Sequence, residues 1–600
     1  MKREDLLDFV DFGARGAAIG ASLFVAGEAG LREVLTLPQA LAWGAGLSAV
    51  TLAGASVAGR AMRTYADLIF PAREPDPREV EYLLPAWPEG PELQIVLGED
   101  HDRAGGFCER PRWYTLPALG LFTGVAVLGA TGAAKTAGVG LPVLRQFFEY
   151  AAADPARRCA GLIMDYKASL VRPARELAEQ HNRAADLILI GPDHPIRWNP
   201  IHAPELEPRV LAARVLAVLE NLSGQSHAGD SSWVAENAGR IIENALGIIR
   251  ITQGYVTLAD IHAFLQELER ALAGDADQEK SPAQLMDEYL AGWQALLPAD
   301  LDSASRTQFE HHCAYFAREY IANDRKFRGI YLSEIARITQ YFADPRYLEQ
   351  FSPRREDINF PGFRAAIDRG LIVVLDATAE RFGPLANALG IFAKLEFQRA
   401  ALARPDEHRR NPDYNFERPL VFFCDEYQEF VSTGQQGDDQ FFALCRESKT
   451  ANVVMTQSRS SLVKKLGEVK TQVVLASLRS KVFLGLSEPE DRDYAARICG
   501  EDWGYVEHVS ASESIEAAGL TAGGQFLGRQ TTVAESRNLS RQKLNRFEPT
   551  VFRDLPTFSA VVSGFDGRQA LPPKLIYLKP FFRPRDERYR DFLAEFGREA

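Results

Sequence analysis

The chain has 600 residues, of which 46% are hydrophobic and 25% charged, so it is long enough for several folded units and is not disordered by composition. Its formal net charge of −13 excludes a broad basic surface for nucleic acid, although a small basic lining inside a channel is compatible with it. Six scattered cysteines without a CxxC pair exclude a disulfide framework or a cysteine zinc site, and they fit a reducing compartment.

The first 70 residues have the pattern of a membrane anchor. Residues 34–59 are uncharged over a length that can cross a bilayer, and the shorter uncharged segment 16–27 precedes them. Basic residues flank the pair on both outer sides, which by the positive-inside rule predicts a transmembrane helical hairpin with both ends in the cytoplasm. A buried helical hairpin and a signal peptide are the alternatives. The signal peptide fits poorly because Glu4, Asp5 and Asp8 dilute its positive start.

Residues 71–92 contain six prolines and are typical of a linker. A phosphate-binding loop follows, between the apolar run 124–128 and the helical pattern 139–150. Backbone N–H groups of such a loop point at phosphate, while its lysine serves the β- and γ-phosphates and its hydroxyl residue serves Mg²⁺. The residues predicted to bind ATP are Gly129, Ala130, Thr131, Gly132, Ala133, Ala134, Lys135 and Thr136.

Ala134 departs from the usual pattern of this loop, because it stands where the second glycine is expected. An alanine costs little there if its φ is negative, and it strains the loop if its φ is positive. Lys135 and Thr136 are both present, so the sequence still predicts a site for ATP and Mg²⁺. The alternative is a glycine-rich turn that joins a strand to a helix.

Seven short apolar runs, several of them separated by helical patterns, predict a parallel α/β sheet of the P-loop NTPase (RecA-like) type. They are residues 125–128, 162–164, 187–190, 372–375, 420–423, 453–455 and 482–484. The long block between the third and fourth runs has helical patterns only, which predicts an inserted all-α domain. The predicted organisation is an anchor at 1–70, a linker at 71–92, a nucleotide-binding domain in two parts at 93–204 and 356–600, and the insertion at 205–355.

Polar residues at strand ends carry the predicted chemistry, because ligands collect at the carboxyl ends of parallel strands. Asp425 and Glu426 end the fifth run, where the aspartate can hold Mg²⁺ and the glutamate can deprotonate the attacking water. Gln457 ends the next run and can contact the γ-phosphate or that water. Asp165 is an alternative metal ligand or a helix cap, and Asp376 is interpreted as structural.

Two further segments leave alternatives open. A basic stretch after Gln457 can face a phosphate backbone or be a solvated helix face. It consists of Arg459, Lys464, Lys465, Lys470, Arg479 and Lys481. Residues 508–545 are polar and rich in serine, and they predict an exposed loop or hairpin.

The order of these motifs resembles the type IV secretion coupling proteins, the TraD/TraG-type ATPases that are relatives of the FtsK/HerA DNA pumps. The predicted anchor and all-α insertion resemble the same family, so the resemblance covers nearly the whole chain. The departures are Ala134 and the short loop between the membrane segments. The motifs that carry the resemblance are Gly129–Thr136, Asp165-x-Lys167, Arg197-Trp198-Asn199-Pro200, Ser232-Trp233, Asp425-Glu426 and Gln457.

The resemblance implies a homo-hexameric, ATP-driven motor on the cytoplasmic face of the bacterial inner membrane. It would pass a relaxase-bound single strand, or duplex DNA, or secreted protein substrates to the components of a type IV secretion channel. ATP would then lie between subunits, and a neighbouring subunit would supply an arginine to it. Arg446 is the candidate for that arginine, with a surface salt bridge as the alternative.

Two other functions remain in competition. One is a DNA translocase or helicase of the same superfamily that works outside secretion and needs no membrane hairpin. The other is a membrane receptor platform that binds ATP but hydrolyses it weakly, for which Ala134 is the only support.

Overall fold

The computed structural model describes residues 80–102, 106–223, 232–273, 280–432, 437–515 and 531–599. Tyr82–Ala600 forms one compact unit. Both predicted membrane segments, and residues 71–79 of the predicted linker, lie outside the described residues. Within the described ranges, no helix combines the length and the apolar character that a membrane crossing needs.

The described unit is built on a large, mostly parallel sheet in the order β2-β1-β13-β12-β9-β3-β8-β7-β4-β6-β5. The strands from β9 to β5 in that order run parallel, and those from β2 to β12 join them antiparallel at one side. The strands are β1 Gln94–Asp100, β2 Arg112–Pro117, β3 Val125–Leu128, β4 Ala160–Asp165, β5 Leu187–Ile190, β6 Ile372–Leu375, β7 Leu420–Asp425, β8 Thr450–Thr456, β9 Ser480–Phe483, β12 Ser559–Ser563 and β13 Lys574–Leu578.

All seven apolar runs form strands, and together they make up the parallel part of the sheet. Parallel strands are covered on both faces and therefore read as continuous apolar segments, as the fully buried β3 and β7 do. The sequence did not predict the four antiparallel strands. In β2, exposed and half-buried residues alternate with buried ones, so no continuous apolar run marks that strand.

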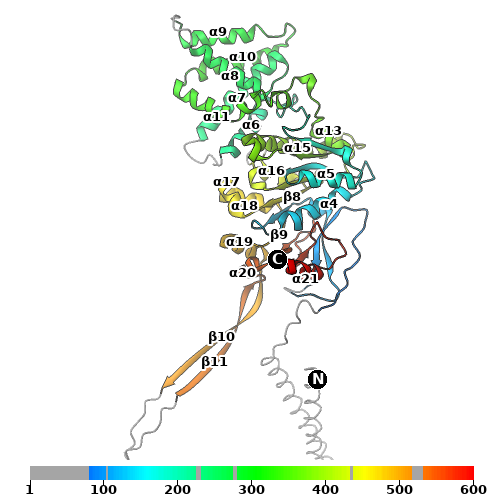
Figure 1. The fold of residues 1–600 in the computed structure, drawn as a ribbon. Helices are drawn as coiled ribbons and strands as arrows, with labels where there is room; N and C mark the ends of the chain where they lie inside the picture. The colour runs from blue at the N-terminus through cyan, green and yellow to red at the C-terminus, as the bar shows by residue number, and fades with distance from the viewer. Residues whose placement is uncertain are drawn as a thin grey trace, which may run out of the picture. The chain divides into compact units, whose positions relative to one another are not determined.

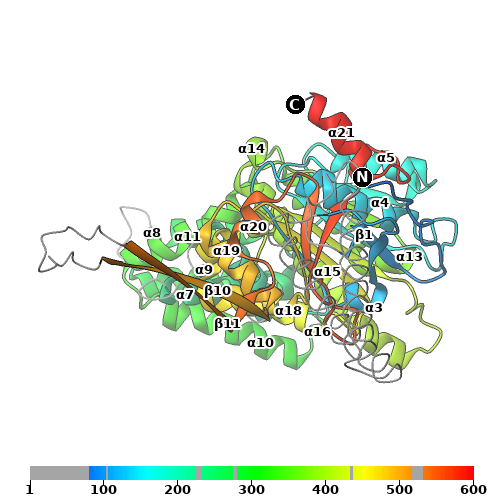
Figure 2. The ribbon, with the colours of Figure 1, turned by 90° about the horizontal axis from the view of Figure 1, so that it is seen from below.

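Helices connect the parallel strands and pack around the sheet (Figures 1 and 2). A π-helical turn, Lys135–Gly140, leads into the first long connecting helix, α4. The helices of this part are α3 Ala118–Leu121, α4 Leu141–Glu149, α5 Val171–Gln180, α13 Gly362–Arg369, α14 Ala379–Phe382, α15 Pro384–Arg410, α16 Asp438–Leu444, α17 Arg459–Leu466, α18 Glu468–Ser477, α19 Pro489–Cys499, α20 Pro549–Asp554 and α21 Tyr589–Glu599.

Between β5 and β6 the described chain contains helices and no strand, and Figure 1 shows helices α6 to α11 gathered beyond α15. We refer to α6–α12 as the all-α insertion. Its helix α6 packs against α15, and one continuous hydrophobic core runs from the sheet into these helices. The helices are α6 Pro208–Ser223, α7 Ser232–Gln253, α8 Leu258–Ala273, α9 Pro282–Gln294, α10 Ser303–Tyr315, α11 Arg325–Ala343 and α12 Leu348–Phe351.

The predicted loop or hairpin near the C-terminus is a long two-stranded ribbon that projects from the unit (Figure 1). Strand β10, Glu501–Ile515, pairs antiparallel with β11, Thr531–Asn545. It begins earlier than the polar composition indicates, and Trp503 and Tyr505 are exposed near its base. The rest of the ribbon is rich in charged and polar residues, so no apolar run in the sequence marks these two strands.

Gly161 provides a test of how tightly β4 is held beside β7. A Cβ at this position would lie 2.1 Å from the carbonyl oxygen of Val421, so Gly161→Ala must push the two strands apart. We expect the free energy of unfolding to fall by about 1–3 kcal/mol, measured as a lower thermal midpoint.

Gly292→Ala is the matched control. Gly292 lies in α9, where an added Cβ meets nothing within 4 Å, so a better helix former should leave the midpoint equal or higher. An unchanged midpoint for Gly161→Ala would show that β4 and β7 have room to separate.

Candidate active site

The phosphate-binding loop lies at the carboxyl end of β3 and leads into the turn that precedes α4. Lys135 curls back inside it, and its ammonium donates to the carbonyl oxygens of Gly129, at 2.7 Å, and Ala130, at 3.2 Å. Burial lowers the pKa of Lys135, while the nearby charges of Glu426 and Asp425 act in the opposite direction. The loop therefore places a largely buried cation at the carboxyl end of β3, which suits a phosphate chain.

Ala134 has the left-handed conformation that the sequence left undecided, with φ 60° and ψ 29°. Of the two alternatives stated above, the strained one holds, because a side chain disfavours this region of the backbone. Ala168 and Glu426 also have positive φ, at 53° and 49°. Three non-glycine residues in strained conformations thus border the same site, and such strain persists only where surrounding contacts enforce it.

Thr136 and Asp425 join two distant segments of the chain. The Thr136 hydroxyl donates to the Asp425 carboxylate across 2.8 Å, because β7 is separated from β3 only by β8. Burial, and then the negative charge of Asp165 at the end of the neighbouring strand β4, raise the pKa of Asp425 to about 6. A divalent cation would relieve this crowding of negative charge. A threonine hydroxyl with one carboxylate, completed by phosphate oxygens, is a common way to hold Mg²⁺.

Asp165 itself is used locally. Its carboxylate accepts hydrogen bonds from the backbone N–H of Lys167, at 3.1 Å, and from the Ser169 backbone and hydroxyl, at 2.5 and 2.7 Å. These contacts hold the turn between β4 and α5, and Asp165 does not cap α5, whose N-cap residue Leu170 has no side-chain capping hydrogen bond. Because Asp165 is engaged in this turn, Asp425 is the better metal ligand.

Glu426 follows Asp425 with its carboxylate held by three donors. Lys167 donates to Oε1 at 2.7 Å, Gln428 to Oε2 at 2.9 Å, and Gln457 to both oxygens at 3.1 Å. Burial alone would raise the pKa of Glu426, but the hydrogen bonds from Lys167 and the two glutamines outweigh it and lower the pKa. The glutamate is therefore oriented and charged at neutral pH.

Gln457 connects the two halves of the site. Besides contacting Glu426, its side-chain oxygen lies 3.4 Å from the hydroxyl of Thr131 in the phosphate-binding loop. The structure thus brings the loop, Asp425, Glu426 and Gln457 together at the carboxyl edge of the parallel strands.

The sequence did not assign roles to Lys167 and Gln428. Lys167 stands two residues beyond the end of β4, and a lysine at that place is the signal that could have indicated its contact with Glu426. Gln428 also accepts from the Thr456 hydroxyl at 2.9 Å, which no sequence pattern indicated.

Arg446 lies away from the residues of this site. It precedes β8, at the amino ends of the parallel strands, and donates to the carbonyl oxygen of Gly567 at 3.2 Å. Within one chain it is therefore on the opposite edge from the phosphate-binding loop. Its role as an arginine offered to a neighbouring subunit stays a prediction.

The basic stretch does not form one face. Lys481 is buried in β9, Arg479 stacks on Phe565 with 4.1 Å to the ring centre, and Arg459 is ion-paired with Glu468. Of the remaining lysines, Lys465 lies 3.5 Å from Glu429, while Lys464 and Lys470 are exposed on α17 and α18. A phosphate backbone could meet only these helical lysines.

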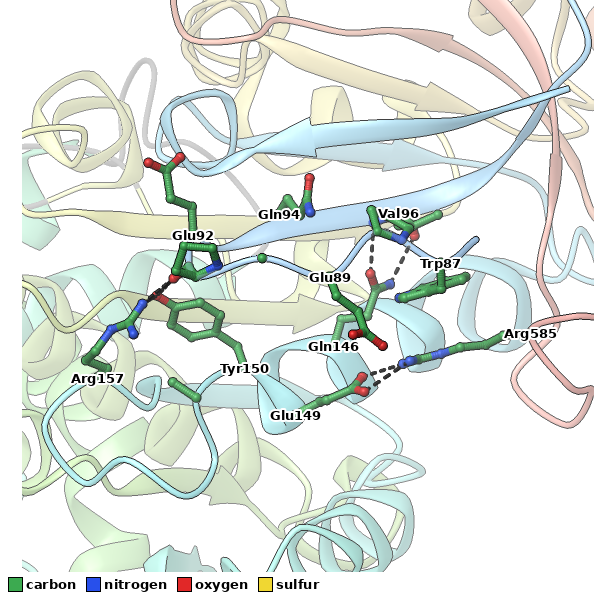
Figure 3. A pocket seen from close by; sticks show the side chains of 14 residues that line it. Trp87, Glu89, Glu92, Gln94, Val96, Gln146, Glu149, Tyr150, Arg157 and Arg585 are labelled. Carbon is green, nitrogen blue, oxygen red and sulfur yellow. Dashed lines mark hydrogen bonds and ion pairs between the residues drawn. The ribbon is translucent and has the colours of Figure 1, made fainter. Parts of the chain in front are cut away.

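A separate cavity of about 340 Å³ lies at the far end of α4 (Figure 3). Arg585 faces Glu149 across it, with 3.1 Å between Nη1 and Oε1, and Arg157 donates to Pro91. Because both arginines are engaged by groups of the protein, this cavity is a poor phosphate site, and the phosphate-binding loop remains the better candidate.

Comparison with known proteins supports the motif-based resemblance. Residues 419–549, which contain Asp425, Glu426 and Gln457, match the family model described as the TraM recognition site of TraD and TraG. The resemblance to TraD/TraG-type conjugative coupling proteins is therefore confirmed. No curated protein sequence matches the chain.

Solved structures give a similar result at the level of the fold. The plasmid coupling protein TrwB in complex with a non-hydrolysable GTP analogue is 16% identical, with a TM-score of 0.50 over 79% of this chain and 89% of that chain. An unbound form, TrwBdeltaN70, is also 16% identical, with a TM-score of 0.48 over 79% and 88%. VirB4 of Thermoanaerobacter pseudethanolicus is 12% identical, with a TM-score of 0.40 over 81% and 96%. The similarity to TrwB in complex with the GTP analogue shows that the two chains share an α/β fold.

The strain at Ala134 predicts the effect of restoring glycine. Ala134→Gly should raise the free energy of unfolding by about 1 kcal/mol, because glycine adopts the left-handed region without a steric penalty. Thermal unfolding of the nucleotide-free protein measures this. Ala151→Gly, at a surface turn with φ 47°, is the matched control and should stabilise similarly without any change in nucleotide affinity. Destabilisation by Ala134→Gly would contradict the left-handed assignment.

Burial of Lys481 predicts a dependence of stability on pH. Burial lowers the pKa of Lys481 to about 8 from its ordinary value of 10.5. Below pH 8, Lys481 is protonated in both the folded and the unfolded protein, and the folded protein bears the full cost of burying the charge. Between pH 8 and 10.5, Lys481 is protonated only in the unfolded protein, so its contribution to the free energy of unfolding rises with pH.

Lys481→Met should therefore raise the free energy of unfolding near pH 7 by roughly 1–3 kcal/mol, and the gain should shrink towards pH 10. Denaturant titrations at several pH values test this. Lys464→Met, which changes an exposed lysine, should have little effect at any pH. A stabilisation that is constant with pH would show that Lys481 is not the titrating group.

Proposed function

We propose that this chain hydrolyses ATP and couples the hydrolysis to delivery of DNA or protein substrates to a type IV secretion channel. The main observation in support of the proposal is that three separate segments of the chain meet in one site. Thr136 meets Asp425 at 2.8 Å, and Gln457 spans from Glu426 to Thr131. The confirmed resemblance to coupling proteins, and the nucleotide analogue in the TrwB complex, support this assignment.

The residues of the site divide the work of hydrolysis. The loop N–H groups and Lys135 would bind the phosphates, and Thr136 and Asp425 would hold Mg²⁺, which neutralises charge on the phosphate oxygens when bound. Glu426 would accept the proton of the attacking water, and Gln457 would orient that water. Because Lys167 occupies one oxygen of Glu426, and its own side chain is 62% exposed, it can swing away and free the base.

The finer parts of the proposal are a membrane hairpin at the N-terminus, a homo-hexamer at the bacterial inner membrane, and Arg446 acting from a neighbouring subunit. Relaxase-bound DNA, or secreted proteins, would be the cargo. The uncharged segment 34–59 and its basic flanks support the anchor. Exposed Lys464 and Lys470 support a narrow contact with a phosphate backbone in a chain whose overall charge is negative.

A weakly hydrolysing receptor platform is the second candidate, and two observations favour it. Ala134 is strained in the loop, and the carboxylate of Glu426 is engaged by Lys167, Gln428 and Gln457. A DNA translocase outside secretion shares the same site and differs in needing no anchor.

Glu426→Gln tests the function. It keeps the shape of the side chain and removes the base, so ATP should bind with unchanged affinity while turnover falls by about 10²–10⁴-fold. Lys135→Ala should lose ATP binding itself, because the cation that faces the phosphates is gone. Isothermal titration with a non-hydrolysable ATP analogue and a steady-state phosphate-release assay, each with and without single-stranded DNA, separate the two effects.

Stimulation of the parent by DNA supports a motor, and slow turnover that DNA does not change supports the platform. Glu429→Gln is the matched control, since Glu429 lies three residues away and contacts Lys465 instead of the site. If Glu426→Gln hydrolysed ATP like the parent, another residue would be the base and the assignment of the site would fail.

A further inference from the structure

The segment that follows the proposed base, Glu426, is held in place by hydrogen bonds to the buried carboxylate of Asp438. We refer to residues 427–432 as the 427–432 loop. Oδ2 of Asp438 accepts from the Tyr427 hydroxyl at 2.8 Å and from the Ser432 backbone N–H at 2.9 Å, so one side chain ties both ends of this loop. Tyr427 and Asp438 are fully buried. The loop therefore cannot shift without breaking hydrogen bonds away from water, where an unmade bond is costly.

Lys394 of α15 completes this buried cluster. Its ammonium donates to Asp438 at 2.6 Å, to the carbonyl oxygen of Phe430 at 2.7 Å and to the Ser432 hydroxyl at 2.8 Å. Gln398, one helical turn further along α15, donates to the other oxygen of Asp438 at 2.6 Å. All three donor positions of the ammonium are used, as a buried charge requires.

Three successive carbonyl groups of the loop accept from three different side chains. Asn387 of α15 donates to Glu429 at 3.1 Å, Lys394 to Phe430, and Asn221 of α6 to Val431 at 2.8 Å. Asn221 belongs to the all-α insertion, whereas the other two donors belong to α15. The 427–432 loop is thus held jointly by the helix next to the sheet and by the insertion.

The backbone of Glu426 needs such support. Its φ of 49° and ψ of 47° lie in the left-handed region, which a glutamate adopts only when its neighbours are fixed. The loop begins at the next residue, and Gln428 within it also binds the Glu426 carboxylate. Any movement of the loop would therefore change both the backbone and the side-chain position of Glu426.

We propose that Asn221, Lys394 and Asp438 are positioning residues for Glu426, so that the all-α insertion sets the rate of hydrolysis through the 427–432 loop. This inference rests on the proposed ATPase function. A ligand or subunit that displaces α6 would move the carbonyl of Val431 and, through the loop, the base. The phosphate-binding residues make none of these contacts, so nucleotide affinity should be independent of them.

Asn221→Leu is the first test, in the full-length protein. It keeps the volume of the side chain and removes the donor to Val431. We expect turnover to fall about tenfold with the Kd for a non-hydrolysable ATP analogue unchanged, because misplacing a base by a fraction of an ångström costs rate rather than binding. Hydrogen–deuterium exchange of the 427–432 amides should become faster.

Asn244→Leu is the matched control for this variant. Asn244 is an asparagine of similar burial in α7 that hydrogen-bonds Arg240 and His312 within the insertion and does not touch the loop. It should leave turnover and exchange at 427–432 as in the parent. Equal losses of turnover in the two variants would overturn the proposal, since they would reflect general damage to the insertion.

Tyr427→Phe tests the other end of the loop, because Lys394→Met alone can prevent folding by leaving Asp438 buried and unpaired. The phenylalanine keeps the ring and loses only the bond to Asp438. We expect lower turnover at an unchanged Kd and faster exchange at 427–432. Parent-like turnover and exchange in both Asn221→Leu and Tyr427→Phe would refute the role of the cluster.

The exchange measurement separates this proposal from the proposed function. If the parent protein does not hydrolyse ATP, the ATPase assignment fails. Faster exchange confined to 427–432 in Asn221→Leu would then still show that the insertion holds this loop, whereas unchanged exchange would remove that link as well.

Discussion

The hydrogen bond between Thr136 and Asp425 is the contact on which the site depends, because it joins the phosphate-binding loop to a strand almost 300 residues later. Parallel packing makes it possible. Strands β3, β8 and β7 are neighbours that run in one direction, so the residues at their carboxyl ends meet at a single edge. Gly161 contributes from β4, where the absence of a side chain lets β7 approach and places Asp165 opposite Asp425.

The backbone of the site is strained at two positions. Ala134 and Glu426 both adopt left-handed backbone conformations. Such conformations cost energy that the surrounding contacts must offset, and here those contacts include the buried cluster of Lys394 and Asp438. A buried ion pair contributes little net stability, since desolvation opposes the attraction between the charges. Its value in this fold is to fix one geometry for the 427–432 loop.

The 427–432 loop connects the sheet with the all-α insertion. Helix α15 lies between the sheet and the all-α insertion. It presents Asn387 and Lys394 to the 427–432 loop, and Gln398 to Asp438, which ties that loop. Asn221 reaches the same segment from the insertion. The all-α insertion thus has a direct polar contact with the 427–432 loop, which follows the proposed base Glu426.

The sequence by itself predicted the parallel sheet, and it predicted that Gly129–Thr136, Asp425, Glu426 and Gln457 lie where its strands end. Buried parallel strands are continuous apolar runs, and ligands collect where such strands end, so local patterns carry this information. Only the tertiary structure decided the sign of φ at Ala134, the contacts of Lys167 and Gln428 with Glu426, and the burial of Lys481 within an apparently basic stretch. Each of these three features depends on which distant segment of the chain packs against the residue. Packing across the whole core decides which segment that is, so the neighbouring residues in the sequence do not reveal it.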